Sequence, residues 1–507
     1  MHLSLADANA WHFVNGRWGC DADGVNGSRS EDGAGLQGFS LAFLKDRAYS
    51  DMEATFTIRM PANHADLGLV VRAQDPTHFY LVHFPQCGQG YRAQHFWAAL
   101  SRADGSGYLR LLAVELVRRV ASNPLGIANQ ARVRVQGNRF QVWVNDHPAL
   151  DVRDDAWAQG RIGLAGFVQF HHGQVIVEGT QVAAPPWDAD VAQVGNWRTP
   201  FSEQGTQQRG ISLARSAAGT VLCAFSSAEG RFLARSRDGG RAWQVQPAPP
   251  NLVGGVQALA NGRLLSVALG TKAESAWSES ADDGVSWSTP VPIAHDPPAG
   301  LKGYGTGWPL ELRDGTLLRF GLGGHVTSSE PITRWGAVHC QAFSTRSTDG
   351  GRTWSAPANL DGEAGDMGNL DLTEPVAFET TDGRIMCLVR PIYSPWMWET
   401  WSTDQGQTWG PCVRGPFAGW APAAPVRTRS GAVLFATRFP GLTVHLTRDE
   451  GMTWDTGTYI DTSIWAMGAL CEVEPDVVLY AYEDSWRDRL RLQRLRVTGD
   501  GLEPAGW

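Results

Sequence analysis

The stretch SRDGGRAW at residues 236–243 decides the fold, because its pattern Ser/Thr-x-Asp-x-Gly-x-x-Trp recurs along the chain. The other copies are SADDGVSW at 280–287, STDGGRTW at 347–354, STDQGQTW at 402–409 and TRDEGMTW at 447–454. In this pattern Asp bonds the backbone of its own turn, Gly adopts a positive φ, and Trp packs beneath a hairpin. The aspartates are 44, 67, 55 and 45 residues apart, a spacing typical of repeated units of short strands. We therefore expect these aspartates to serve folding rather than catalysis.

The same region contains a series of short apolar strands that each end at a turn residue. These turn residues are Gly219, Gly262, Gly315, Gly383, Gly431 and Asp476. Six such innermost strands over about 190–507 predict a six-bladed β-propeller. We expect the stretch around 195–205 to pair with the last blade and close the ring, because closure removes exposed sheet edges.

Residues 1–182 carry no copy of the pattern and alternate apolar with polar side chains, as strands do. The clearest strands are ATFTIRM (54–60), LGLVVRA (67–73), FYLVHF (79–84), ARVRVQGNRFQVWVND (131–146) and GRIGLAGF (160–167). Two antiparallel sheets packed as a jelly roll accommodate this pattern. The predicted fold class is all-β, with a β-sandwich at 1–184, a linker at 185–194 and a propeller at 195–507.

Composition excludes several classes of function. The 43 cationic and 52 anionic side chains give a net charge of −9, which argues against a nucleic-acid partner. No apolar run is long enough to span a membrane, and the start MHLSLADANAWHF shows no leader, so we expect a cytoplasmic protein unless a leader was removed. The seven cysteines form no CxxC pair, which favours reduced thiols. We expect neither a metal nor a cofactor.

Five copies of the pattern on a propeller resemble the sialidase (neuraminidase) superfamily, and VRVQGNRFQVWVNDHPALDV (133–152) resembles concanavalin/laminin-G-like sandwiches. Sialidases hold the substrate carboxylate with three arginines, whose planar guanidinium groups match a carboxylate. The resemblance implies Arg209 in QRGISLARSAAGTVLCAF, Arg390 in EPVAFETTDGRIMCLVRP and Arg438 in GAVLFATRFPGLTVHLTRDEG. The Glu-Pro opening of the second of these stretches implies a functional Glu374.

The sequence departs from sialidases at two catalytic positions. The place of the tyrosine nucleophile is taken by Met467 in WAMGALCEVE. The loop that carries the acid/base aspartate is reduced to SSAEGRFLAR (226–235), where Glu229 is the single acid. Arg209 also lies in Arg-Gly-Ile-Ser where the family has Arg-Ile-Pro. These departures point either to altered catalysis or to a binding propeller.

Replacement chemistry needs other groups near the propeller axis. Glycoside hydrolysis uses two carboxyl groups, for which Glu374, Glu311 and Asp371 are candidates. Glu311 could instead point between sheets and pair with an arginine. His325 and His339 are candidates for lining the cleft, with a structural role as the alternative. Aromatic residues expected at channel loops could stack on sugar rings: Tyr304, Trp308, Trp420 and Trp465.

The leading hypothesis is an exo-acting glycosidase that removes a terminal acidic sugar, sialic acid-like or uronic, from a glycan. Arg209, Arg390 and Arg438 would bind the carboxylate, and Glu374 would act as base or nucleophile. The alternatives are a polysaccharide lyase on uronate-containing glycans, which needs arginines and a base but no carboxylate pair, and a glycan-binding propeller without catalysis.

Overall fold

The computed structural model describes most of the chain: residues 2–3, 7–14, 16–22, 24–28, 38–60, 65–89, 93–117, 126–187, 196–198, 209–268, 275–293, 301–306, 309–326, 338–360, 372–391, 394, 396–420, 423–462, 468–484 and 489–507. These residues fold almost wholly into strands, with one short 3₁₀ helix at Ala8–Ala10. No helix within these ranges has the length and apolar character needed to cross a membrane. Residues 188–195, most of the predicted linker, lie outside the described residues.

The chain divides into two compact units. The first comprises Met1–Asn196 with two later segments, Pro440–Thr443 and Thr456–Ile464, and the second comprises Trp197–Phe439, Val444–Asp455 and Trp465–Trp507. The strands of the first 196 residues are β1 (His2–Leu3), β2 (Trp11–Phe13), β3 (Arg17–Asp21), β4 (Gly24–Ser28), β5 (Ser40–Arg59), β6 (Asp66–Asp75), β7 (His78–His83), β8 (Gln86–Gln89), β9 (Ala93–Asp104), β10 (Leu109–Leu116), β11 (Ala128–Gln136), β12 (Arg139–Val144), β13 (His147–Arg153), β14 (Gly160–Phe167), β15 (Gln169–Gly173) and β16 (Val175–Val182).

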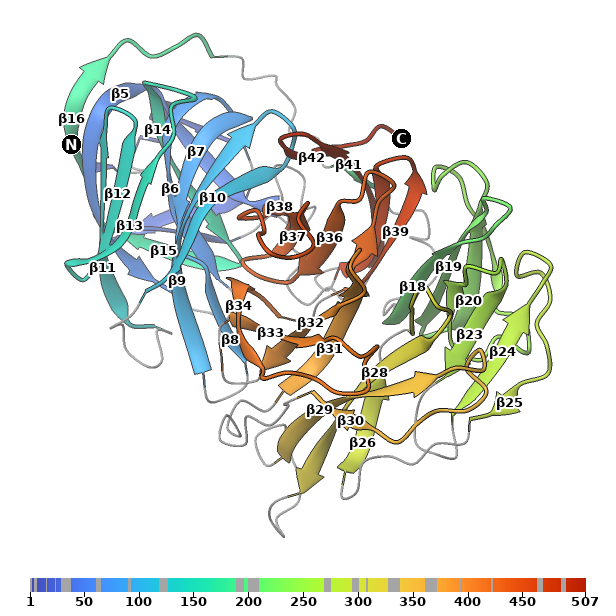
Figure 1. Cartoon of the computed structure of the whole chain (residues 1–507). Coiled ribbons are helices and arrows are strands. Elements are labelled where there is room, and N and C mark those ends of the chain that lie inside the picture. The colour runs from blue at the N-terminus through green and yellow to red at the C-terminus, as the bar shows by residue number, and fades with distance from the viewer. Residues whose placement is uncertain are drawn as a thin grey trace. The chain divides into compact units, whose positions relative to one another are not determined.

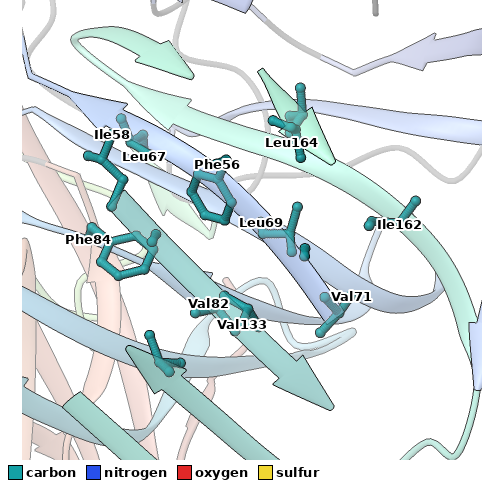
Figure 2. Packing of buried hydrophobic residues seen from close by; sticks show 14 of the residues in the cluster. Phe56, Ile58, Leu67, Leu69, Val71, Val82, Phe84, Val133, Ile162 and Leu164 are labelled. Carbon is teal, nitrogen blue, oxygen red and sulfur yellow. The ribbon is translucent and has the colours of Figure 1, made fainter. Parts of the chain in front are cut away.

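The long strand β5 belongs to both layers of the first unit. The first half of β5 pairs with β14, and in the same layer β14 pairs with β6, β6 with β7, β7 with β9, and β9 with β10. The second half of β5 pairs with β11 on one side and with β16 on the other. Side chains alternate along it, so that Phe56 and Ile58 are fully buried while Thr55 and Thr57 are half-buried. Figure 2 shows Phe56 and Ile58 in the apolar cluster with Leu67, Leu69, Val82, Phe84, Val133, Ile162 and Leu164. Burial of each such side chain contributes about 1.5–3 kcal/mol, which makes this layer the core of the predicted sandwich.

The second unit is a ring of sheets (Figure 1). The first blade comprises β18 (Arg209–Arg215), β19 (Val221–Ser227), β20 (Gly230–Ser236) and β21 (Gln244–Pro247), and the second comprises β22 (Gly255–Ala258), β23 (Leu264–Ala268), β24 (Ala276–Ser280) and β25 (Val291–Pro292). The third blade comprises β26 (Leu301–Thr306), β27 (Leu310–Glu311), β28 (Leu317–Val326), β29 (Val338–Ser347) and β30 (Ala358–Asn359), and the fourth comprises β31 (Leu372–Glu379), β32 (Ile385–Pro391), β33 (Trp396–Ser402) and β34 (Val413–Ala418). The last blade comprises β39 (Gly468–Glu474), β40 (Val477–Asp484), β41 (Arg489–Thr498) and β42 (Gly501–Pro504), and β17 (Trp197–Arg198) joins it. Because β17 pairs with β41, the predicted closure of the ring by residues near 195–205 is confirmed for 197–198.

The prediction of six blades is wrong in its count, because the described residues form five separate blade sheets. The strands between the fourth and last blades are β35 (Val426–Arg427), β36 (Val433–Thr437), β37 (Leu442–Thr447) and β38 (Thr458–Asp461). They belong to one 20-stranded sheet with the strands of the sandwich. The physical reason is edge pairing: β38, part of the first unit, pairs with β10, where Tyr459 lies opposite Leu109. An unpaired strand edge attracts another strand, and here β10 occupies it.

Neighbouring elements of the ring share buried apolar layers. The first and second blades share Leu222 and Leu264, the second and third Leu265 and Leu317, the third and fourth Leu318 and Ile385, and the last and first Leu479 and Val221. Phe378 of the fourth blade packs with Val433 and Phe435 of the β35–β36 hairpin. Packing between blades, rather than within one sheet, therefore holds the ring together.

The two ends of the ring differ in the connections that they carry. Each innermost strand begins at one end, which we name the loop end, and runs to a tight turn at the other, the turn end. In the fourth blade, β31 and β32 pair from Leu372 with Pro391 at the loop end to Glu379 with Ile385 at the turn end. Strand β33 returns to the turn end, where Ser402 lies opposite Ile385 and the repeated pattern follows. The repeated pattern therefore lies at the turn end, away from the starts of the innermost strands.

Hydrogen bonds explain the repeated pattern. In SADDGVSW the Asp282 carboxylate accepts hydrogen bonds from the hydroxyl of Ser280 (2.8 Å) and from the backbone N–H of Ser286 (2.9 Å). The Trp287 indole donates to the Gly284 carbonyl at 3.1 Å and is 7% exposed. Equivalent bonds surround the other four aspartates of the pattern, Asp238, Asp349, Asp404 and Asp449. The predicted folding role of these aspartates is confirmed.

A second hydrogen-bond pattern links neighbouring elements at the turn end. A glutamate of one element accepts the backbone N–H of the tight turn of the element before it: Glu311 from Ala260 (2.7 Å), Glu379 from Arg313 (2.8 Å), Glu450 from Thr381 (3.0 Å) and Glu472 from Arg429 (2.9 Å). Such charge-assisted bonds to backbone N–H groups are stronger than neutral ones. These glutamates therefore fasten the turns of the ring to one another.

Candidate functional site

The strongest candidate site lies at the loop end of the fourth blade, where Glu374 and Arg390 meet. Glu374 Oε2 lies 2.6 Å from Arg390 Nη1, and the two side chains are 26% and 11% exposed. The pairing of β31 with β32 is interrupted between Thr373 and Val376, so that a bulge carries Glu374 and Pro375. The Thr373 hydroxyl donates to the Arg390 carbonyl at 3.0 Å and fixes the strand end beneath the pair. Bulges re-aim side chains at strand ends, and this one directs Glu374 onto Arg390.

The backbone of Glu374 is strained. Its φ is +48°, in the left-handed region that L residues avoid at a cost of about 1–2 kcal/mol. The following Pro375 adds to the cost, because the residue before proline favours an extended backbone. Strain of this kind persists only where the surroundings impose it, and it clusters at functional sites. The geometry therefore marks Glu374 as the acid to examine first.

Arg438 occupies the equivalent position in the next element of the ring. Arg390 lies seven residues after the turn glycine Gly383, and Arg438 lies seven after Gly431. The ladder of β35 and β36 continues to Arg438, whose N–H donates to the Trp420 carbonyl at 3.0 Å, and its side chain is 8% exposed. Two of the three predicted arginines thus lie at the loop end of neighbouring elements.

The same seven-residue offset reveals an acid that the sequence analysis missed. Glu483 lies seven residues after the turn residue Asp476, on β40 of the last blade. It is half-buried and lies opposite Leu490 of β41. Its signal is the position relative to the turn, the same seven-residue offset that Arg390 and Arg438 have. Glu374, Arg390, Arg438 and Glu483 therefore occupy the loop end of three successive elements.

The backbone of Arg209 lies opposite Ser226 at the loop end of the first blade, and its side chain lies outside the described part of the chain. Beside it is a cavity of about 360 Å³ between the first and second blades, lined among others by Gly210, Phe225, Arg231 and Phe232. The two phenyl rings stack with centroids 5.5 Å apart. The Arg231 guanidinium donates to the Gly254 carbonyl at 3.2 Å, and burial lowers its pKa. Among its described lining residues, the cavity combines apolar walls with the cation of Arg231.

The structure does not bring Glu311 to Glu374. Glu311 precedes the turn of the third blade, where it accepts the Ala260 N–H, and it corresponds to Glu379 of the fourth blade. Glu374 and Glu379 are five residues apart along one strand, or about 16 Å at the strand rise of about 3.3 Å per residue. Glu311 thus lies at the turn end and has a structural partner. That partner is the backbone N–H of Ala260, whereas the alternative interpretation expected an arginine.

The other predicted site residues contribute less to the described geometry. Trp420 is 2% exposed and packs edge-to-face on Phe439 with centroids 4.9 Å apart, so its indole does not face solvent. The backbones of His325 and His339 lie opposite each other in β28 and β29. The side chains of three predicted residues lie outside the description: Tyr304, His325 and His339. Four positions lie outside it altogether: Asp371, Trp308, Trp465 and Met467.

Metal-ligating groups are not gathered at this site. Within the ranges that the structure describes, no group of three or more His, Cys, Asp or Glu side chains is arranged to hold a metal ion. What the described site offers is cations for an anionic ligand and carboxylates for proton transfer.

Comparison with known proteins places two segments of the chain. Residues 264–425 match the family model of the BNR repeat-like domain, and residues 5–176 match that of the 3-keto-alpha-glucoside-1,2-lyase-like domain. No curated protein gives a significant match.

Three solved structures illustrate the structural similarity. A protein of unknown function from Dyadobacter fermentans has 15% identity and a TM-score of 0.48, covering 61% of this chain and 98% of its own. A Hadza microbial sialidase has 16% identity and a TM-score of 0.45, covering 88% and 93%. A leech intramolecular trans-sialidase has 12% identity and a TM-score of 0.43, covering 89% and 94%. Because all three TM-scores are below 0.5, the residue assignments depend on this chain's own geometry. The chain thus joins a segment that matches the 3-keto-alpha-glucoside-1,2-lyase-like domain to a propeller of which residues 264–425 match the BNR repeat-like domain.

Proposed function

We propose that the protein acts on glycans as an exo-acting glycosidase, and that it removes a terminal acidic sugar at the loop end of the propeller. The observation that carries this proposal is the Glu374–Arg390 pair at 2.6 Å on a left-handed backbone. A strained acid held against a guanidinium group, with Arg438 at the equivalent position of the next element, is suited to an anionic substrate. The sugar is either sialic acid-like or uronic.

Binding of the carboxylate falls to the arginines. A guanidinium group binds a carboxylate through two parallel hydrogen bonds, which a lysine cannot reproduce. Arg390 and Arg438 supply two such groups from adjacent elements, and Arg209 would supply the third from the first blade. Since both described side chains are largely buried, their hydrogen bonds to a substrate carboxylate would form in a medium of lower dielectric constant than water and gain strength.

Hydrolysis needs a second carboxyl group besides Glu374. In both classes of glycosidase one acid protonates the leaving oxygen, while the other carboxylate attacks the anomeric carbon or activates the water that does so. Glu374 takes the second of these roles in the proposal, because the bulge holds its carboxylate 2.6 Å from Arg390 at the loop end, where the substrate carboxylate would bind. Glu483 takes the role of the acid, since it is half-buried and lies at the same end of the ring, on β40 of the last blade.

The cavity in the first two blades would hold an uncharged substituent of the sugar. It adjoins the backbone of Arg209 through Gly210 and Ser226, and stacked phenyl rings form part of its wall. Its volume of about 360 Å³ lies at the lower end of the range of about 300–1,000 Å³ for small-molecule sites.

A substrate screen tests the proposal. The full chain is incubated with sialosides, glucuronides and their neutral counterparts, and products are identified by mass. The expected result is release of one acidic monosaccharide with uptake of one water, and a loss of about 10²–10⁴-fold in Glu374→Gln, the usual contribution of a positioned acid or base. Glu450→Gln is the matched control, because Glu450 also has a positive φ and an arginine partner but lies at the turn end. Unchanged turnover in Glu374→Gln would refute the role of this residue.

A lyase is the second candidate, favoured by the backbones of His325 and His339, which lie opposite each other where β28 and β29 approach the loop end. One imidazole would abstract the proton next to a uronate carboxylate that the arginines neutralise. In that case the product carries a new carbon–carbon double bond with ultraviolet absorbance and no water is taken up, which the same mass measurement distinguishes from hydrolysis.

A further inference from the structure

A cleft with both apolar and polar lining lies on the first unit, at the small sheet formed by β3, β4 and β15 with the end of β5. Its volume is about 520 Å³, within the range of small-molecule sites. Its lining includes the rings of Trp18 and Phe170 and six polar residues: Arg17, Asn26, Ser28, Arg59, Gln169 and His171. None of the described residues that line this cleft is acidic, and the carboxylate of Asp21 lies beside it, 3.6 Å from His171 Nε2.

Strand register places these side chains in two rows. In one row Arg17 lies opposite Ser28, which lies opposite Gln169. In the other, Asn26 lies opposite His171, which lies opposite Arg59 of β5. Directly opposed residues share a face of a sheet, and residues two apart along a strand share it as well. All of these side chains therefore project from one face.

Trp18 and Phe170, which alternate with these rows along the same strands, also line the cleft and pack in the apolar cluster of this unit. Trp18 and Phe170 meet there edge-to-face with centroids 5.1 Å apart, and Gly27 lies between them in the register. A Cβ at Gly27 would come within 2.5 Å of the Phe170 ring. The glycine thus lets the two rings close beneath the cleft, so that the polar rows rest on a rigid support.

Two nitrogen atoms of the cleft residues lack partners. Arg59 Nε and His171 Nδ1 are buried, and neither has a hydrogen-bond partner among the described residues. Buried polar atoms in native proteins are nearly always paired, so each exception calls for a missing partner such as a ligand or water. The neighbouring Asp21 accepts from Asn26 Nδ2 at 2.9 Å and from the Gly24 N–H at 3.1 Å, and it lies 3.6 Å from His171 Nε2, so that Nδ1 is the nitrogen of His171 that remains without a partner in the described part of the chain.

We propose that this cleft is a second saccharide site, which binds a sugar residue bearing a carboxylate. The guanidinium groups of Arg17 and Arg59 match the carboxylate, while the planar amides of Asn26 and Gln169 offer both donors and acceptors to ring hydroxyls. A simple inorganic anion would use the arginines but not the amides. The site is separate from the propeller and does not depend on catalysis there.

Calorimetric titration tests the proposal on the full chain carrying Glu374→Gln, which prevents turnover. The probes are a tetrasaccharide that ends in glucuronic acid, its counterpart that ends in glucose, and inorganic sulfate. The expected result is saturable binding of the acidic tetrasaccharide that Arg59→Gln weakens at least about tenfold, as the loss of a hydrogen bond to a charged group does. Arg59→Lys, which keeps the charge, should recover part of the affinity. Arg153→Gln is the control, because Arg153 is an exposed arginine of the same unit outside the cleft.

The outcomes are distinguishable from those of the proposed function. Binding at the propeller would instead respond to Arg390→Gln and leave the site that depends on Arg59 intact. Three outcomes would each overturn the proposal. The glucose-ended probe binds as tightly as the acidic tetrasaccharide, or the acidic tetrasaccharide binds no more tightly than sulfate. In the third outcome, Arg59→Gln is folded by circular dichroism and leaves the affinity for the acidic tetrasaccharide unchanged.

Discussion

The left-handed backbone of Glu374 gives a prediction that separates strain from chemistry. In an ordinary strand, glycine is less stable than alanine by about 0.5–1 kcal/mol, because glycine loses more backbone freedom on folding. At φ +48° an alanine pays the left-handed cost of about 1–2 kcal/mol, which glycine does not. Both substitutions remove the carboxylate from Arg390 equally. Glu374→Gly should therefore be more stable than Glu374→Ala by about 1 kcal/mol, which reverses the usual order.

Glu450 provides a matched position for this comparison. It has a φ of +65°, and its carboxylate lies 2.8 Å from Arg427, with side chains 24% and 30% exposed. Glu450→Gly should likewise be more stable than Glu450→Ala by about 1 kcal/mol. The two positions should differ in function, since only the Glu374 variants should lose turnover.

Urea unfolding followed by tryptophan fluorescence measures the stability differences, and product release measures function. If alanine and glycine at position 374 are equally stable, the backbone is not strained in solution and the structural argument for a functional acid fails. If the Glu450 variants lose turnover to the same extent as the Glu374 variants, then the loss at 374 reports damage to the fold rather than to the chemistry.

Three further predictions concern other carboxylates. Hydrogen bonds from the hydroxyl and N–H of Ser286 lower the pKa of Asp282 to about 2 from an ordinary 3.8. The contribution of this carboxylate to stability is therefore complete above about pH 4 and is lost as the pH falls toward 2. The melting temperature of Asp282→Asn should fall less steeply over this interval than that of the wild type, and an equal fall in both proteins would contradict the reasoning. Glu311→Gln should lower the free energy of unfolding by about 1 kcal/mol while kcat stays unchanged, since Glu311 only accepts the Ala260 N–H. Glu483→Gln should reduce kcat by about 10²-fold or more with little change in urea midpoint, and retention of activity would exclude Glu483 as the acid.

Local information predicted most of the propeller, and non-local pairing explains the error. The aspartate of the repeated pattern forms its hydrogen bonds within eight residues, so sequence alone identifies each hairpin and its end of the blade. The number of separate sheets depends on which strand covers an edge. Nothing near Thr458 indicates that β38 pairs with β10, more than 300 positions earlier in the chain.

The positions of the candidate residues were predictable in part for a similar reason. The local contexts of Arg390, Arg438 and Glu374 identify strand ends, and the structure has all three at the loop end, while their role in function stays a prediction. Glu311 was placed near the axis without regard to strand direction, which puts it at the turn end beside Ala260. Glu483 was missed because its position becomes meaningful only when distances are counted from the turn of each blade. Counting from the turn, rather than from the strand start, would have separated these two acids.

The pairing of β38 with β10 has a consequence for dissecting the molecule. A single cut near residue 196 would not yield two complete folds, because the N-terminal piece would lack Thr456–Ile464 and the C-terminal piece would keep that segment without its hydrogen-bonding strand. Tyr459, now 1% exposed, would then face water, and the orphaned edge would invite aggregation. A soluble isolated propeller calls for polar replacements along 456–462, whereas an isolated sandwich calls for that strand to be supplied as a tethered or separate peptide.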